Sequence, residues 1–119
     1  SRVDVKNLYT LEAHEDGAEI QIKSPADNEP TDFYIKVKGV DSKAYREAVR
    51  KYHRKLLNDE EGGEIDLLTA VTIGWRGLKS GKDTVEFSPE VAKGLYENAP
   101  NVASQVDRFI ADRVNFTKG

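Results

Sequence analysis

The chain has 119 residues and a formal net charge of −3, and 33% of its residues are charged against 38% hydrophobic. This length predicts one domain with one modest core, and the absence of cysteine excludes disulfides, thiolate metal sites and a cysteine nucleophile. No apolar run reaches the roughly 18 residues that span a membrane, and the first residues lack the apolar segment of a signal peptide, so we expect a cytoplasmic protein.

The first 40 residues predict a β-hairpin. Residues 1–17 are mixed in character, and their only expected anchors to a core are Val3, Val5, Leu8 and Leu11. Residues 18–23 and 33–38 alternate apolar and polar side chains, and this period of two is typical of half-buried strands. The stretch SPADNEPT (24–31) carries two prolines and predicts a long loop between the strands.

Residues 41–119 predict about four helices. The first, capped by Asp41 or Ser42, ends near Leu57, before the stretch DEEGGE (59–64). A short strand is expected over 84–87, a helix starts at Ser88-Pro89-Glu90, and Pro100 and Asn101 separate it from the last helix. The second and last helices are expected to carry two apolar stripes, Leu67, Leu68, Val71, Trp75 and Leu78, and Val102, Val106, Phe109 and Ile110. The predicted fold is therefore α+β, an N-terminal β-hairpin followed by about four α-helices, in a single domain over 1–119 (hairpin region 1–40, helical region 41–119).

Two glycines beside the only tryptophan need an explanation. Gly74 inside a helix costs about 1 kcal/mol relative to alanine. Either another element crosses closely at Gly74, or the helix ends near Gly77, which would cap it. A functional alternative, compatible with both, is that Trp75 and the bare glycine surface receive a partner. We expect Trp75 to be mainly core and to pack on the stripe of residues 102–110.

No pattern of catalytic residues stands out. His14-Glu15-Asp16 is a poor metal cluster because adjacent positions rarely converge on one ion, and His53 lies on a basic helix where a solvated histidine is the ordinary interpretation. Two histidines without cysteine leave little for zinc. The chain has no GxSxG turn, and GLKSGK is too short for a phosphate-binding loop.

The charge is distributed in blocks. Residues 41–57 carry six basic and two acidic side chains, whereas residues 58–66 carry five acids and no base. Opposite blocks predict head-to-tail contact between copies, through Arg46, Arg50 and Arg54 on one side and Asp59, Glu60 and Glu61 on the other. The alternative is that both blocks are solvated surface.

A second functional class is nucleic-acid binding by the basic helix 43–55. Lys43, Arg46, Arg50 and Arg54 could contact phosphates from one face of that helix. However, Tyr45 and Tyr52 share the apolar stripe of the helix, and the neighbouring acidic block would repel the phosphates. Nucleic acid is therefore the less favoured partner.

Several stretches together resemble one protein family. The strings YTLEAHEDGAEIQI, AVTIGWRGL, VEFSPE, LYENAP and QVDRFIADRVNF, in this order and spacing, resemble tail assembly chaperones of long-tailed, lambda-like bacteriophages with non-contractile tails. The resemblance covers nearly the whole chain. Its specificity lies in the combination, because no single string is a catalytic signature.

The resemblance implies a non-catalytic protein without a cofactor. Members of this family bind the tape measure protein in the host cytoplasm, keep it soluble while the tail tube polymerises, and are absent from the finished virion. Many have a longer form, made by ribosomal frameshifting, whose extension is thought to recruit the tail tube protein. For the client we predict contacts from Arg108, Arg113 and Phe116, since arginine and aromatic residues are enriched at interface hot spots. Alternatively, Phe116 closes the core and the arginines are solvated.

Overall fold

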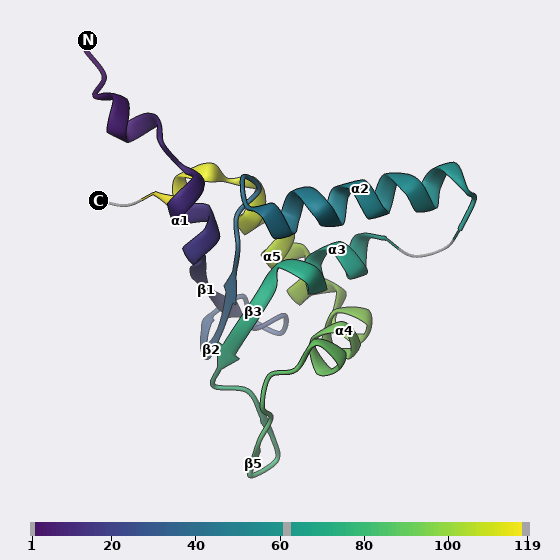
Figure 1. Ribbon diagram of the computed structural model, residues 1–119. Helices are drawn as coiled ribbons and strands as arrows, with labels where there is room; N and C mark the ends of the chain where they lie inside the picture. The colour runs from purple at the N-terminus through teal and green to yellow at the C-terminus, as the bar shows by residue number, and fades with distance from the viewer. Residues whose placement is uncertain (1, 61–62, 118–119) are drawn as a thin grey trace.

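The computed structural model describes residues 2–60 and 63–117, which form a mixed α/β fold (Figure 1). Helical elements precede the first strand, so the expectation that the chain opens with the hairpin is wrong, while the α+β character is confirmed. The elements, in chain order, are η1 (Val5–Leu8), α1 (Leu11–Asp16), β1 (Ala18–Lys23), β2 (Pro30–Val37), α2 (Lys43–Leu57), α3 (Glu64–Val71), β3 (Thr72–Arg76), β4 (Lys79–Ser80), β5 (Asp83–Thr84), α4 (Pro89–Asn98), α5 (Pro100–Ala111) and η2 (Arg113–Phe116).

The main sheet has three antiparallel strands in the order β1-β2-β3. The predicted hairpin supplies β1 and β2, and Ile35 at its centre pairs with Ile20 on one side and with Trp75 on the other. The alternation of residues gives the sheet a buried face and a polar face. On the polar face the Arg76 guanidinium lies 4.0 Å from the centre of the Tyr34 ring and pairs with Glu19 at 3.0 Å.

The segment around Trp75 is a strand, so the prediction of one helix through Leu78 is wrong. α3 ends at Val71, and the backbone turns extended at Thr72. The residues Val71, Thr72 and Ile73 are branched at Cβ, which favours a pleated strand over a helix. In addition, β2 needs a second partner to become a central strand, and β3 satisfies its free backbone groups.

Both helical explanations of the glycines are therefore also wrong. Gly74 lies in β3 facing open space, since a Cβ added there would meet no atom within 4 Å. Gly77 follows the strand with φ of +86°, and a Cβ there would overlap the backbone carbonyl of Asp32. Gly77 is thus required by the turn after β3 and by its close approach to β2.

The expected helix boundaries elsewhere are largely confirmed. The Ser42 hydroxyl accepts from the Tyr45 amide at the start of α2, and Ser88 caps α4 in the same way, with proline at the first turn. Pro100 begins α5, as the interruption before it predicted. The strand expected over 84–87 is shorter, Asp83–Thr84, and pairs with β4 in a small separate ribbon.

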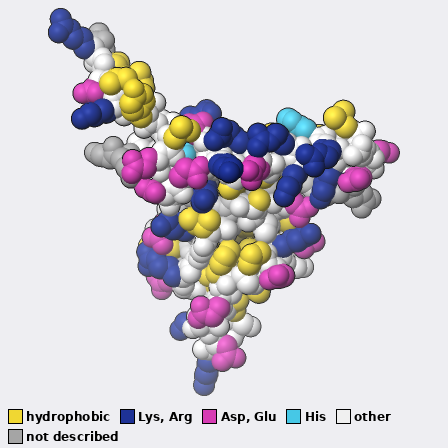
Figure 2. All heavy atoms as spheres, viewed as in Figure 1, with side chains coloured by type: hydrophobic (Ala, Val, Ile, Leu, Met, Phe, Trp, Pro, Cys, Tyr) yellow, Lys and Arg dark blue, Asp and Glu magenta, His cyan; other side chains and the backbone are white. Residues whose placement is uncertain are grey.

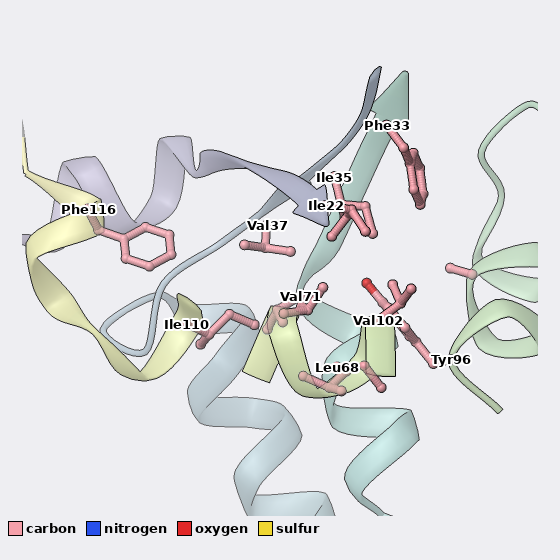
Figure 3. Close-up of a cluster of buried hydrophobic side chains, with 13 residues drawn as sticks. Ile22, Phe33, Ile35, Val37, Leu68, Val71, Tyr96, Val102, Ile110 and Phe116 are labelled. Atoms are coloured by element: carbon pink, nitrogen blue, oxygen red, sulfur yellow. The ribbon is translucent and has the colours of Figure 1, made fainter. Parts of the chain in front are cut away.

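The core lies between the buried face of the sheet and the helices α3, α4 and α5 (Figure 3). Ile35 and Val37 of β2 meet Val71 of α3 and Val106 of α5, and each of these four is completely buried. Trp75 is only half-buried at the edge of this cluster, where its ring packs edge-on against Phe33 and Phe87. The predicted packing of Trp75 on the stripe of α5 is replaced by this aromatic group, while α5 contacts β1 and α3.

One buried polar contact fixes the switch from α3 to β3. The Thr72 hydroxyl donates to the Leu68 carbonyl at 2.7 Å, and it lies 2.7 Å from the Tyr96 hydroxyl. Because the Thr72 hydrogen is used on Leu68, the Tyr96 hydroxyl is the donor in the second contact. Burial raises the pKa of Tyr96 to about 12.

Candidate functional site

The start of the chain forms an exposed apolar arm. Residues 2–9, here called the N-terminal arm, extend away from the body (Figure 1). The Asp4 carboxylate accepts from the Lys6 amide and caps the short helix η1, none of whose residues is buried. The exposed apolar side chains on and beside the arm are Val3, Val5, Leu8, Tyr9 and Leu11. The prediction that four of these anchor the chain to the core is wrong.

The base of the arm is held by a buried histidine. His14 of α1 has no exposed surface, and its Nδ1 accepts from the Asp41 amide at 3.0 Å. In the neutral ring the proton is therefore on Nε2, which lies 3.5 Å from a carboxylate oxygen of Asp41. The ring also packs on Phe116, with 5.0 Å between ring centres. Gly39 belongs to this site because any Cβ at that position would overlap the imidazole.

Asp41 joins three segments of the chain. One carboxylate oxygen accepts from the Thr10 hydroxyl at 2.8 Å and the other from Arg113 of η2 at 3.2 Å. The hydrogen bond from Arg113, with help from Thr10, holds the pKa of Asp41 below its usual range. His14, Asp41 and Arg113 thus connect α1, the turn before α2 and the C-terminal segment; we call this the terminal junction. A groove of about 530 Å³ opens between the arm, at Lys6 and Tyr9, and this C-terminal segment.

The three residues predicted to contact a client occupy different environments. Arg113 pairs with Asp41 in the terminal junction, and Arg108 lies exposed on α5. Phe116 is only 1% exposed and packs on His14 and Phe109. A direct contact of Phe116 with a client would therefore require the C-terminal segment to move. The interpretation that Phe116 closes the core agrees with this geometry.

Helix α2 presents the predicted basic residues on an exposed face. Arg46, Arg50 and Arg54 are all exposed, and dark blue side chains cover this helix in Figure 2. Asp59 and Glu60 are exposed immediately after the same helix, whereas Glu61 lies outside the described residues. The basic and acidic blocks are therefore neighbours in space as well as in sequence.

The tyrosines of α2 turn toward the protein. Tyr45 packs against the core, and the ring of Tyr52 covers Gly63, where a Cβ would overlap it. Both rings are half-buried on the inner side of α2, whereas the arginines of the same helix are exposed. The carboxylate of Asp66 in α3 forms ion pairs with Lys55 of α2 and Lys93 of α4, each with a nitrogen–oxygen distance of 3.1 Å. These two hydrogen bonds, Lys55 first, hold the pKa of Asp66 below its usual range.

The described part of the chain contains no group of three or more histidine, cysteine, aspartate or glutamate side chains placed to hold a metal ion. Residues 14–16, considered above as a metal cluster, have different partners in the structure. His14 accepts a hydrogen bond from the Asp41 amide, whereas Glu15 accepts one from the Lys43 amide. Within the same described ranges, no helix is long and apolar enough to cross a membrane.

Nothing in the sequence pattern predicts the terminal junction. The sequence marks His14 only as a poor metal ligand and Asp41 only as a possible helix cap, because neither residue type indicates a partner so distant in sequence. Comparison of the chain with protein-family models, with curated proteins and with solved structures gives no match.

Proposed function

We propose that this chain is a non-catalytic tail assembly chaperone of a long-tailed bacteriophage. In this proposal it binds the tape measure protein in the host cytoplasm, keeps it soluble during assembly of the tail tube, and is not part of the finished virion. A longer frameshifted form that recruits the tail tube protein belongs to the same proposal. The resemblance in sequence suggests this client, and the uncovered apolar arm is the structural observation that carries a binding role.

The shape of the molecule supports a role in binding a larger partner. Its radius of gyration is 15.6 Å, whereas a compact chain of this length would have about 13.5 Å. The difference arises because the N-terminal arm and the end of α2 project from the body (Figure 1). Contiguous apolar side chains on such a projection are uncommon in a monomer and indicate an interaction site.

The terminal junction anchors the arm to the body of the protein. His14 is buried under Phe116, and Asp41 ties Thr10 and Arg113 together, so the residues on either side of the groove are held in place. We propose that an apolar face of the client lies along the arm, at Leu8 and Tyr9. In the same proposal Arg108, which is exposed on α5, adds a charged contact to the client that contributes orientation rather than most of the affinity.

Co-expression with the tape measure protein from the same phage tests this proposal. The variant Val5→Ser, Leu8→Ser, Tyr9→Ser should stay folded by circular dichroism, because these side chains are 54%, 65% and 74% exposed. It should nevertheless leave the client insoluble. Leu56→Ser is the matched control, since Leu56 is 57% exposed but lies near the end of α2.

The result that would contradict the proposal is equally specific. A folded arm variant that keeps as much tape measure protein soluble as the wild-type chain would show that the arm is not the client surface. Wild-type protein that fails to solubilise the client at all would contradict the function itself.

A further inference from the structure

An acidic groove lies between the helices of the body. It has a volume of about 740 Å³, and its apolar lining includes Leu68 of α3 and Tyr96 of α4. Three acids line it, Glu64, Glu97 and Asp107, from three different helices, and its lining contains no lysine, arginine or histidine. Such a groove favours an apolar ligand that carries positive charge.

The outer face of α2 has the complementary character. Arg46, Arg50 and Arg54 recur on successive turns, about 6 Å apart along the helix, and among residues 2–60 and 63–117 none of them forms an ion pair. The Arg46 side chain donates a hydrogen bond to the Ser42 carbonyl at 3.4 Å. Leu57, at the end of the same helix, is 87% exposed and adds an apolar group.

These two surfaces cannot meet within one molecule. Ala48 is the buried residue of α2, and Arg46 and Arg50 lie about 160° around the helix from it. The arginines therefore point away from the body, whereas Tyr45 and Tyr52 of the same helix line the groove. A second copy of the chain can bring a basic face to the groove.

We propose that the outer face of α2 docks into the acidic groove of a second copy. The acceptor is then the groove with Glu64, Glu97 and Asp107, rather than the block Asp59, Glu60 and Glu61, which begins at the end of the donor helix itself. Because the two surfaces differ, the contact is heterologous, and each copy retains one free α2 face or one free groove. The copies therefore form open arrays or closed rings. This self-association does not depend on the identity of the client.

Sedimentation velocity of the purified chain alone tests the proposal. At roughly 0.1 M salt the sedimentation coefficient should rise with protein concentration, and at 1 M salt it should fall back, because the Debye length shortens from about 10 Å to about 3 Å. Arg50→Glu with Arg54→Glu should raise the dissociation constant at least about tenfold, since attraction becomes repulsion. Glu97→Lys with Asp107→Lys should have the same effect from the other surface.

Mixing the two double variants is the decisive experiment. The first retains an intact groove and the second an intact α2 face, so an equimolar mixture should form a dimer that cannot extend further. Lys79→Glu with Lys82→Glu is the matched control, because it reverses two exposed charges on the β4–β5 ribbon and should associate like the wild type.

Three results would overturn the proposal. One is double variants that associate as strongly as wild type, and another is a mixture that remains monomeric. The third is a wild-type chain that stays a strict monomer at low salt and high concentration, which would leave the groove to a basic segment of another protein. Circular dichroism of each variant separates loss of contact from loss of folding.

Discussion

Truncation of Phe116 tests whether the C-terminal segment is part of the core. The side chain is 1% exposed and lies 5.0 Å from the ring of His14 and 5.6 Å from that of Phe109, measured between ring centres. Phe116→Ala removes the aromatic contacts and leaves a cavity, which typically costs about 3–5 kcal/mol. For a chain of this length each kcal/mol corresponds to about 4 °C, so the melting temperature should fall by about 12–20 °C.

Thermal and urea unfolding followed by circular dichroism would measure this loss. Val114→Ala is the matched control, because Val114 belongs to the same short helix but is 68% exposed. It should change the free energy of unfolding by less than about 0.5 kcal/mol. A loss below about 1 kcal/mol for Phe116→Ala would refute the core assignment and return Phe116 to the candidates for client contact.

Three further predictions concern substitutions of single residues. The wild type should lose stability relative to Tyr96→Phe as the pH rises from about 10 to about 12. The reason is that the tyrosine ionises near pH 10 in the unfolded chain, whereas burial raises its pKa in the folded chain to about 12. Urea unfolding of both proteins at several pH values measures the difference. Gly77→Ala should destabilise the fold by at least about 1–2 kcal/mol, whereas Gly74→Ala should stay within about 0.5 kcal/mol, since only the Gly77 position has a positive φ and a backbone overlap. Asp66→Asn should be less stable than the wild type at pH 7, and the difference should shrink as the pH falls below the usual carboxyl pKa of about 3.9. The lowered pKa of Asp66 stabilises the fold above that pH, and this contribution is lost as the pH falls through the folded pKa.

The local signals in the sequence were sufficient where one period was clear. The alternation of Phe33, Ile35 and Val37 correctly gave a strand with one buried face, and Ser42 and Ser88 correctly marked helix starts. In each case the backbone conformation is decided by neighbouring residues, so a single sequence contains the needed information.

The conformation of the segment Val71–Arg76 cannot be predicted from its local residue pattern. Val71 and Trp75 are four residues apart, which suits one helix face, but Val71, Ile73 and Trp75 also alternate as in a strand. The choice is made by β2, which lies some 35 residues earlier and lacks a second partner until Thr72–Arg76 pairs with it. Local spacing cannot report such a distant requirement.

The terminal junction was hidden for a related reason. His14 and Asp41 are 27 residues apart and Arg113 is 72 residues beyond Asp41, so their contacts depend on the whole topology. The prediction that the apolar residues of the arm reach the core is wrong because the structure places them, exposed, on a projection. Composition alone does not distinguish a buried valine from an exposed one.

The pairing of β1 with the last long helix has a consequence for folding on the ribosome. Gln105 of α5 accepts from the Lys23 amide at 2.8 Å and donates to the Lys23 carbonyl at 2.9 Å, across 82 residues of sequence. An emerging chain therefore leaves the part of the sheet that α5 covers exposed until α5 has been synthesised. A hairpin alone is marginally stable in water, so nascent chains halted before Pro100 should remain protease-sensitive, and the native state should appear in a single late step.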